Sequence, residues 1–247
     1  MKNGKDVLYC GDASLSAGAQ YLTGIMTHNN ISYDYIRMHE PMPEGQIEGD
    51  YKLYVLSDYP SENFSAKEAE KLIQKIRDGS SLLMIGGWES FHGLLGNYHV
   101  SPLGQVLPVN CLQEDDRNNC TQGLIPELVL SHPITDGLPW DEPPVVCGFN
   151  RVEPKKGSST LLHLRRLKIS KSAVTLDEEK IPFLVVGEFG SGKTGALTTD
   201  IAPHWAGGFV DWGVKRVQAH APGSIAIEVG DYYAAFIHNL LRFFLKI

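Results

Sequence analysis

The strongest constraint on the fold is the alternation of strand-like and helix-like segments along the first ninety residues. Short apolar runs that end in turn residues alternate with stretches in which apolar residues recur at helical spacing. Strands that alternate with helices predict a parallel sheet covered by helices on both faces. The expected strands are 6–10, 33–38, 52–57 and 82–87, and the expected helices are 15–26 and 65–79.

The helix expected at 65–79 has the clearest local signals. Its first residues, SAKE, form a capping box in which the Ser65 hydroxyl and the Glu68 carboxylate bond to each other's free backbone amides. Apolar residues then fall on one face, and Gly79 is a typical stop signal. The buried strand at 82–87 follows directly and ends in two glycines.

The rest of the chain predicts additions to this core. The middle third is rich in proline and glycine, which indicates loops and short strands. Strand-like patterns return at 159–167, 181–189 and 194–200, and the chain ends in an amphipathic helix that includes 236–247. Polar residues interrupt that helix, so we expect it to pack against the sheet. Because no repeat and no linker divides the sequence, we expect a single domain over 1–247.

Composition excludes several classes of partner. The chain has 29 acidic and 22 basic side chains, a net charge of −7, and no basic run longer than Arg165-Arg166. Nucleic acids and anionic membranes are disfavoured because they require concentrated positive charge. The N-terminal apolar run is too short for a signal peptide, and no segment has the length of a membrane span, so we expect a cytoplasmic protein. The four cysteines lack CxxC pairing and are expected to be reduced.

The segment GEFGSGKT at 187–194 matches the phosphate-loop pattern GxxxxGK[ST]. A phosphate loop requires a helix after the Lys-Thr pair, because the helix N-terminus binds the phosphates. Here Gly195, several threonines and Pro203 follow, and this composition favours another strand. We therefore predict an antiparallel hairpin in which Gly190 and Gly192 supply positive backbone angles.

Polar side chains follow the strand at 82–87. Its exit through Gly86-Gly87 into Trp88-Glu89-Ser90 is similar to a nucleophile elbow, which holds a side chain at the carboxyl edge of a sheet. On this interpretation Trp88, Glu89, Ser90 or His92 faces a pocket. In the alternative, the glycines permit a tight turn and the tryptophan packs in the core.

A second set of polar residues follows the strand at 194–200. Asp200 and His204 in TTDIAPHW offer a carboxylate and an imidazole, which suit general acid and base chemistry but are too few to hold a metal ion. In the alternative, Asp200 caps the next segment and His204 is a core histidine. Asp12 and Asp58 also come just after predicted strands, where capping or turn formation is their expected role.

These residues carry a resemblance to a known family. GGWESFHGLLGNYHVSPLGQVLPV and PFLVVGEFGSGKTGALTTDIAPHWAGGFVDW are similar to the class I glutamine amidotransferase-like superfamily, in a bacterial branch with GGxxSFxG and DxxPHW signatures. The resemblance implies a flavodoxin-like three-layer α/β sandwich with a mostly parallel central sheet and an added antiparallel β hairpin region. It also implies that GGWESF forms the elbow and that TTDIAPHW lies near the region of the amidotransferase histidine.

The sequence differs from that of true amidotransferases at the chemical centre. Those enzymes carry a cysteine at the elbow and a His-x-Glu pair on a later strand, so that a thiolate attacks glutamine. Here the elbow reads Gly87-Trp88-Glu89-Ser90, and the later strand ends in Asp200. We therefore do not expect ordinary glutaminase activity.

Three functions are compatible with this sequence. The first is a domain without the glutaminase triad that binds an unidentified small molecule at the strand ends, with no cofactor and no metal. The second is a hydrolase in which Ser90 attacks, His204 or His92 is the base, and Asp200 or Glu89 orients that base. The third is a non-catalytic regulatory protein that forms a homo-oligomer. The expected ligand-binding residues are Gly87, Trp88, Glu89, His92 and Trp205.

Overall fold

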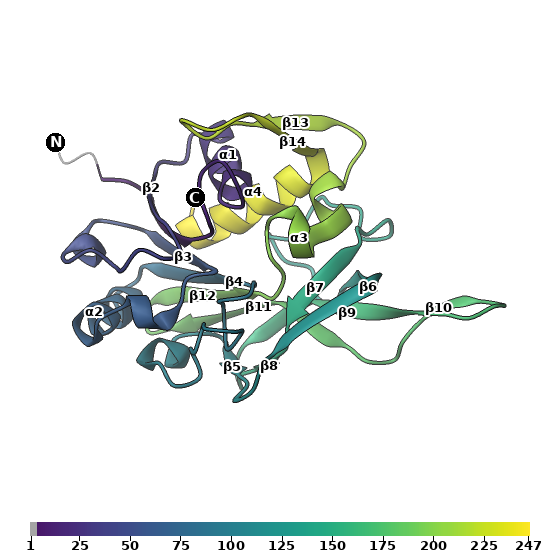
Figure 1. The fold of residues 1–247 in the computed structure, drawn as a ribbon, viewed down its shortest axis with the longest axis horizontal. Helices are drawn as coiled ribbons and strands as arrows, with labels where there is room; N and C mark the ends of the chain where they lie inside the picture. The colour runs from purple at the N-terminus through teal and green to yellow at the C-terminus, as the bar shows by residue number, and fades with distance from the viewer. Residues whose placement is uncertain (1–3) are drawn as a thin grey trace.

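The computed structural model describes residues 4–247, which form a large mixed sheet with a layer on each face (Figure 1). Five neighbouring strands, in the order β2-β1-β3-β4-β12, run parallel to one another. Their carboxyl ends therefore meet at one edge of the sheet. These strands are β1 (Val7–Gly11), β2 (Tyr33–Ile36), β3 (Leu53–Ser57), β4 (Ser81–Ile85) and β12 (Gly192–Leu197).

The sheet continues beyond β12 with antiparallel strands in the order β11-β9-β6-β7. A further short strand, β10, pairs with the end of β9, and the two form an arm that projects from the body of the molecule (Figure 1). These strands are β6 (Arg117–Leu128), β7 (Val146–Asn150), β9 (Ser159–Ile169), β10 (Val174–Leu176) and β11 (Ile181–Phe189).

Helices cover the parallel part of the sheet on both faces. Helices α1 (Gln20–His28) and α4 (Asp231–Leu245) lie over one face, and α2 (Ala66–Arg77) lies on the opposite side (Figure 1). Apolar side chains alternate along the strands between the two faces, so each face buries its own cluster, with Val55 in one and Leu56 in the other. The remaining strands and α-helix are the paired strands β5 (Val109–Cys111) and β8 (Val152–Pro154), the hairpin of β13 (Arg216–Ala219) and β14 (Ile227–Gly230), and the short helix α3 (Pro203–Ala206).

The sequence predicted most of this α/β core. The Ser65 hydroxyl caps α2 by accepting a hydrogen bond from the Glu68 amide at 3.2 Å. The first helix begins at Gln20, later than expected, because residues 15–19 form turns. The predicted hairpin is confirmed as β11 and β12, with Gly190 at φ 61°. The positive angle expected at Gly192 is wrong: this glycine is needed because a Cβ would lie 2.2 Å from the Ile76 carbonyl oxygen.

The middle third differs from the expected loops and short strands. It contains β6, a twelve-residue strand in which Gly123 has φ 88° and interrupts the register with β7. Pro126 lies within this strand, opposite Leu164 of β9. Glycine and proline are poor strand formers, and this explains why the pattern indicated a loop. Between residues 4 and 247, no helix has the length and the apolar content needed to cross a bilayer.

Candidate functional site

Three aspartates lie at the carboxyl edge of the parallel strands. Asp12 follows β1, Asp58 follows β3, and Asp200 lies just beyond the end of β12. Strand β4 runs between β3 and β12. The turn that follows β4 at residues 86–93, called the elbow below, therefore lies among these carboxyl groups. Asp12 and Asp58 both have left-handed backbone angles, with φ of 53° and 49°. Ligands of parallel sheets bind at this edge, which makes it the candidate site.

Burial raises the pKa values of the three carboxyl groups, and the charges of neighbouring aspartates add to this effect at Asp58 and Asp200. Burial raises the pKa of Asp12 to about 6, against the effect of a hydrogen bond from the Tyr9 hydroxyl. Burial, and then the charge of Asp12, raises the pKa of Asp58 to about 7. Burial together with the charges of Asp12 and Asp58 holds the pKa of Asp200 well above its usual value. The group therefore retains protons near neutral pH, where carboxyl groups normally have none.

Ser90 fixes the elbow to the neighbouring strand. Its side chain is 1% exposed. The hydroxyl donates to the carbonyl oxygen of Ile85 at 2.6 Å and accepts from the amide of Asp58 at 3.0 Å. Both bonds go to backbone groups, so the serine oxygen joins the end of β4 to the end of β3.

Asp58 binds the elbow from the same side. Its Oδ1 accepts a hydrogen bond from the amide of Glu89 at 2.7 Å. The carboxylate also lies against Gly87, where a Cβ would be 2.1 Å from Oδ1. The close approach of Asp58 therefore requires a glycine at position 87.

Asn150 and Asp116 bind the elbow from the opposite side. Asn150, at the end of β7, accepts from the Gly87 amide through Oδ1 at 2.8 Å, and its Nδ2 donates to the Gly87 carbonyl oxygen at 3.0 Å. The same Nδ2 donates to Asp116 at 2.8 Å. The carboxylate of Asp116 accepts from the amides of His92 and Gly93 at 2.9 and 3.0 Å. Asn150 and Asp116 are buried.

These contacts determine what the elbow backbone can bind. The amides of Gly87, Glu89, His92 and Gly93 all donate to protein side chains. An acyl-transfer site needs amides directed at the place where an oxyanion forms. In this elbow, side-chain oxygens of Asp58, Asn150 and Asp116 accept the hydrogen bonds of these four amides instead. Phe91 is buried with φ 53°, an angle that bulky residues rarely adopt and that the surrounding bonds maintain.

Aromatic and cationic groups form the outer rim. Trp88 is 42% exposed, and the His204 ring lies 5.8 Å from it between centroids. The Arg117 guanidinium lies 4.7 Å from the centre of the Trp88 ring and is paired with Asp115. The structure thus brings together Trp88 and His204, which the sequence separates by more than a hundred positions.

The other predicted residues are placed differently. His92 bonds through Nδ1 to the Leu112 carbonyl oxygen and stacks on His99, with ring centres 4.4 Å apart. Trp205 is 1% exposed, packs on Gly148 and donates to Asn119 at 2.7 Å. Glu89 is half-buried, and burial raises the pKa of its carboxyl group. Asp200 accepts at Oδ1 from the amides of Ile201 and Ala202 in a local turn, and it does not cap α3, whose N-cap residue is Ala202.

Sequence reasoning missed Asp116, Arg117 and Asn150. Asn150 ends a strand in the region interpreted as loops, and Asp116 directly precedes β6, which begins at Arg117. A polar residue directly after an apolar run, as in VCGFN, was the available signal for Asn150. Within residues 4–247, no three His, Cys, Asp or Glu side chains are arranged to hold a metal ion.

Comparison with known proteins places this geometry in a family. None of the curated proteins matches the sequence. Two cytoplasmic proteins of Salmonella typhimurium, STM3548 and STM1381, are each 25% identical, with TM-scores of 0.74 and 0.76. Both matches cover 96% of this chain and 98% of the Salmonella protein. A ThuA-like protein from Parabacteroides merdae has the same fold at 8% identity, with a TM-score of 0.63 over 97% of this chain and 90% of that one.

A family model described as "Putative glutamine amidotransferase" matches residues 9–218. This range includes the elbow, the three aspartates and the Trp88–His204 pair. The chain therefore belongs to that glutamine amidotransferase-like family.

Proposed function

We propose that this protein is an amidotransferase-like domain without glutaminase chemistry, which binds a small polar metabolite at the carboxyl edge of its parallel strands. The observation that carries the proposal is the occupied elbow: Asp58, Asn150 and Asp116 accept the hydrogen bonds of its amides. In this state the amides of Gly87, Glu89, His92 and Gly93 are not available to an oxyanion. The elbow suits recognition better than acyl transfer.

The chemistry of the nearby thiol supports the same proposal. Cys10 lies at the same edge, as the second-to-last residue of β1, and it is 1% exposed. Burial raises the pKa of its thiol far above neutral pH. Because the thiolate is the nucleophile in glutamine hydrolysis, a buried neutral thiol does not replace the missing elbow cysteine.

The ligand that best fits this edge is a hydroxyl-bearing ring such as a sugar. Carboxyl groups that keep protons near neutral pH both donate and accept hydrogen bonds, as hydroxyl groups require. The exposed Trp88 supplies an aromatic surface for a ring. In this proposal Trp88, Glu89, His204 and the half-buried Asp58 contact the ligand, while Gly87, Ser90 and Asp200 shape the site around them.

A thermal-shift screen with sugars, amides, amino acids and nucleotides tests this proposal, because a ligand that binds the folded state raises its stability. We expect a shift with a sugar or polyol that is lost in the Trp88→Ala/His204→Ala double variant. The His28→Ala variant, changed at an exposed histidine at the end of α1, is the matched control and should keep the shift. A ligand that shifts all three proteins equally would place binding elsewhere.

We also propose that the fold is flavodoxin-like and that the protein is cytoplasmic. The strand order β2-β1-β3-β4-β12 supports a flavodoxin-like arrangement, since doubly wound sheets of that class use the order 2-1-3-4-5. The two Salmonella proteins are described as cytoplasmic, and we assign this protein to the same compartment.

A further inference from the structure

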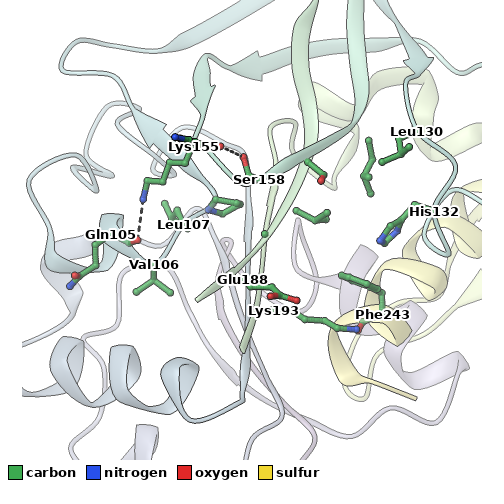
Figure 2. A pocket seen from close by; sticks show the side chains of 17 residues that line it. Gln105, Val106, Leu107, Leu130, His132, Lys155, Ser158, Glu188, Lys193 and Phe243 are labelled. Atoms are coloured by element: carbon green, nitrogen blue, oxygen red, sulfur yellow. Dashed lines mark hydrogen bonds between the residues drawn. The ribbon is translucent and has the colours of Figure 1, made fainter. Parts of the chain in front are cut away.

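A cavity of about 610 Å³ lies at the opposite edge of the sheet from the candidate site (Figure 2). Its wall includes Lys193 at the start of β12, whereas Asp200 lies beyond the end of that strand. The two sites are therefore separated by the length of β12, about 20 Å. The volume is within the range that holds a small organic molecule, about 300 to 1,000 Å³.

The cavity concentrates positive charge in an acidic protein. Its 17 lining residues include Lys155, Lys156 and Lys193 but one acidic residue, Glu188, while the whole chain carries a net charge of −7. Burial lowers the pKa of His132, the remaining titratable group of the lining, below its usual value. An anion is thus favoured here over a cation.

The three ammonium groups have donors to spare. Lys193 donates one hydrogen bond, to the Phe243 carbonyl oxygen at 2.9 Å, and Lys155 donates two, to the carbonyl oxygens of Gly104 and Gln105. Lys156 is exposed and has no bonded partner among residues 4–247. Since each ammonium carries three N–H groups, donors remain at all three positions.

Apolar side chains line the space between these lysines. Val186 and Leu161 belong to the sheet, Leu130 follows β6 and is 49% exposed, and Phe243 comes from α4. Figure 2 shows Lys155 and Gln105 on one side of the cavity and His132 and Phe243 on the other. A ligand that fills it needs an apolar body as well as an anionic group.

We propose that this cavity binds a small organic anion composed of a carboxylate on a hydrocarbon or aromatic body. The lysines on the two sides supply the positive potential that attracts the carboxylate, which pairs with one of them, and the wall of Leu130, Leu161, Val186 and Phe243 receives the apolar part. Lys193 belongs to the GEFGSGKT hairpin, so the segment that matches a phosphate loop contributes an anion-binding lysine without forming a nucleotide site.

Titration calorimetry of the full chain with octanoate tests this assignment, with 1-octanol as the neutral probe of equal length and inorganic phosphate as the anion without an apolar body. We expect octanoate to bind one site, and 1-octanol and phosphate each to bind at least about tenfold more weakly. Equal affinity for octanoate and 1-octanol, or no saturable octanoate binding at millimolar concentration, would overturn the proposal. Phosphate binding as tight as octanoate binding would do the same.

Three single variants test whether octanoate binds in this cavity. Lys156→Met removes a charge from an exposed residue, and Leu130→Glu adds a repulsive carboxylate to the exposed part of the apolar wall. Both should leave thermal unfolding unchanged and weaken octanoate binding, by about threefold and at least about tenfold respectively. Lys67→Met, on the exposed face of α2 next to Glu44, should bind octanoate normally. Unchanged octanoate affinity in Leu130→Glu would exclude this cavity.

Discussion

Asn150 and Gly87 form a reciprocal pair of hydrogen bonds, in which the side-chain amide of one residue satisfies both backbone groups of the other. The asparagine thus continues the pairing pattern of a strand at the point where β4 ends. It ties the elbow to β7, which belongs to the antiparallel half of the sheet. The shape of the candidate site therefore depends on a residue that need not touch any ligand.

Replacing Asn150 with alanine should be strongly destabilising. The change leaves the amide and carbonyl of Gly87 without their partner in a buried position, and it removes one of the two hydrogen bonds that Asp116 Oδ1 accepts. We expect the free energy of unfolding to fall by about 2 to 4 kcal/mol, measured by urea denaturation. Asn110→Ala, at an exposed position of β5, should cost less than about 0.5 kcal/mol. Equal losses in both variants would contradict the role given to Asn150.

Ser90 should be inert towards a serine-reactive phosphonate. The hydroxyl is buried and bonded to two backbone groups, and no histidine within residues 4–247 is bonded to it. Intact-mass measurement is expected to find no phosphonate adduct on Ser90, and Ser90→Ala should lower stability by about 1 to 3 kcal/mol. Ser172→Ala, in an exposed turn, is the control for stability. A stoichiometric adduct at Ser90 would support the hydrolase hypothesis instead.

The stability of the protein should decrease as the pH rises through the acidic range. In the unfolded chain Asp12 and Asp58 ionise near 3.8, whereas in the folded protein burial raises their pKa values to about 6 and about 7. Between these values the folded state holds more protons than the unfolded state, so the contribution of Asp12 and Asp58 to the free energy of unfolding falls with pH and levels off above about pH 7. Urea titrations across this range measure the slope.

Asp200→Asn should make that pH profile flatter and raise stability at pH 8. The asparagine Oδ1 still accepts from the amides of Ile201 and Ala202, while the carboxyl group whose ionisation is opposed by burial and by the charges of Asp12 and Asp58 is removed. Asp136→Asn, at an exposed position, is the comparison. A steeper profile in Asp200→Asn than in the wild-type protein would disprove the assigned repulsion.

Gly148→Ala should displace Trp205. A Cβ at position 148 would lie 2.3 Å from Cδ1 of the buried indole, which also donates to Asn119. We expect a loss of about 1 to 3 kcal/mol and a red shift of tryptophan fluorescence. At exposed Gly208 an added Cβ meets nothing closer than 3.6 Å, so Gly208→Ala should change neither measurement.

Local signals predicted the parallel half of the fold. Ser65 and Glu68 define the start of α2 within four residues, and apolar runs define β3 and β4, because these elements depend on neighbours in sequence. Strand β6 escaped prediction, because Gly123 and Pro126 oppose a strand locally and the pairing with β9 overrides them. Long-range pairing of this kind has no signature in a short window of sequence.

The sequence likewise predicted the strand-end positions of the candidate site but not its long-range side-chain contacts. The sequence placed Asp12, Asp58 and Asp200 at strand ends, and parallel pairing brings such ends together. It did not indicate that the Ser90 hydroxyl points to the Ile85 carbonyl or that Asn150 binds Gly87, since both contacts depend on side-chain directions in the folded state. The proximity of Trp88 and His204 likewise results from the pairing of β4 with β12.

The position of β12 between β4 and β11 has a consequence for the newly made chain. Strand β4 pairs with β3 on one side, but its other partner begins at Gly192, so the ribosome must add residues 86–191 before that side is covered. During this interval the apolar segment LLMI presents unpaired backbone groups to other chains. Such non-local pairing is slow because a long loop must close first. Synthesis at high concentration therefore favours aggregation of this protein through β4. Chaperones that bind the nascent strand should raise the yield of soluble protein.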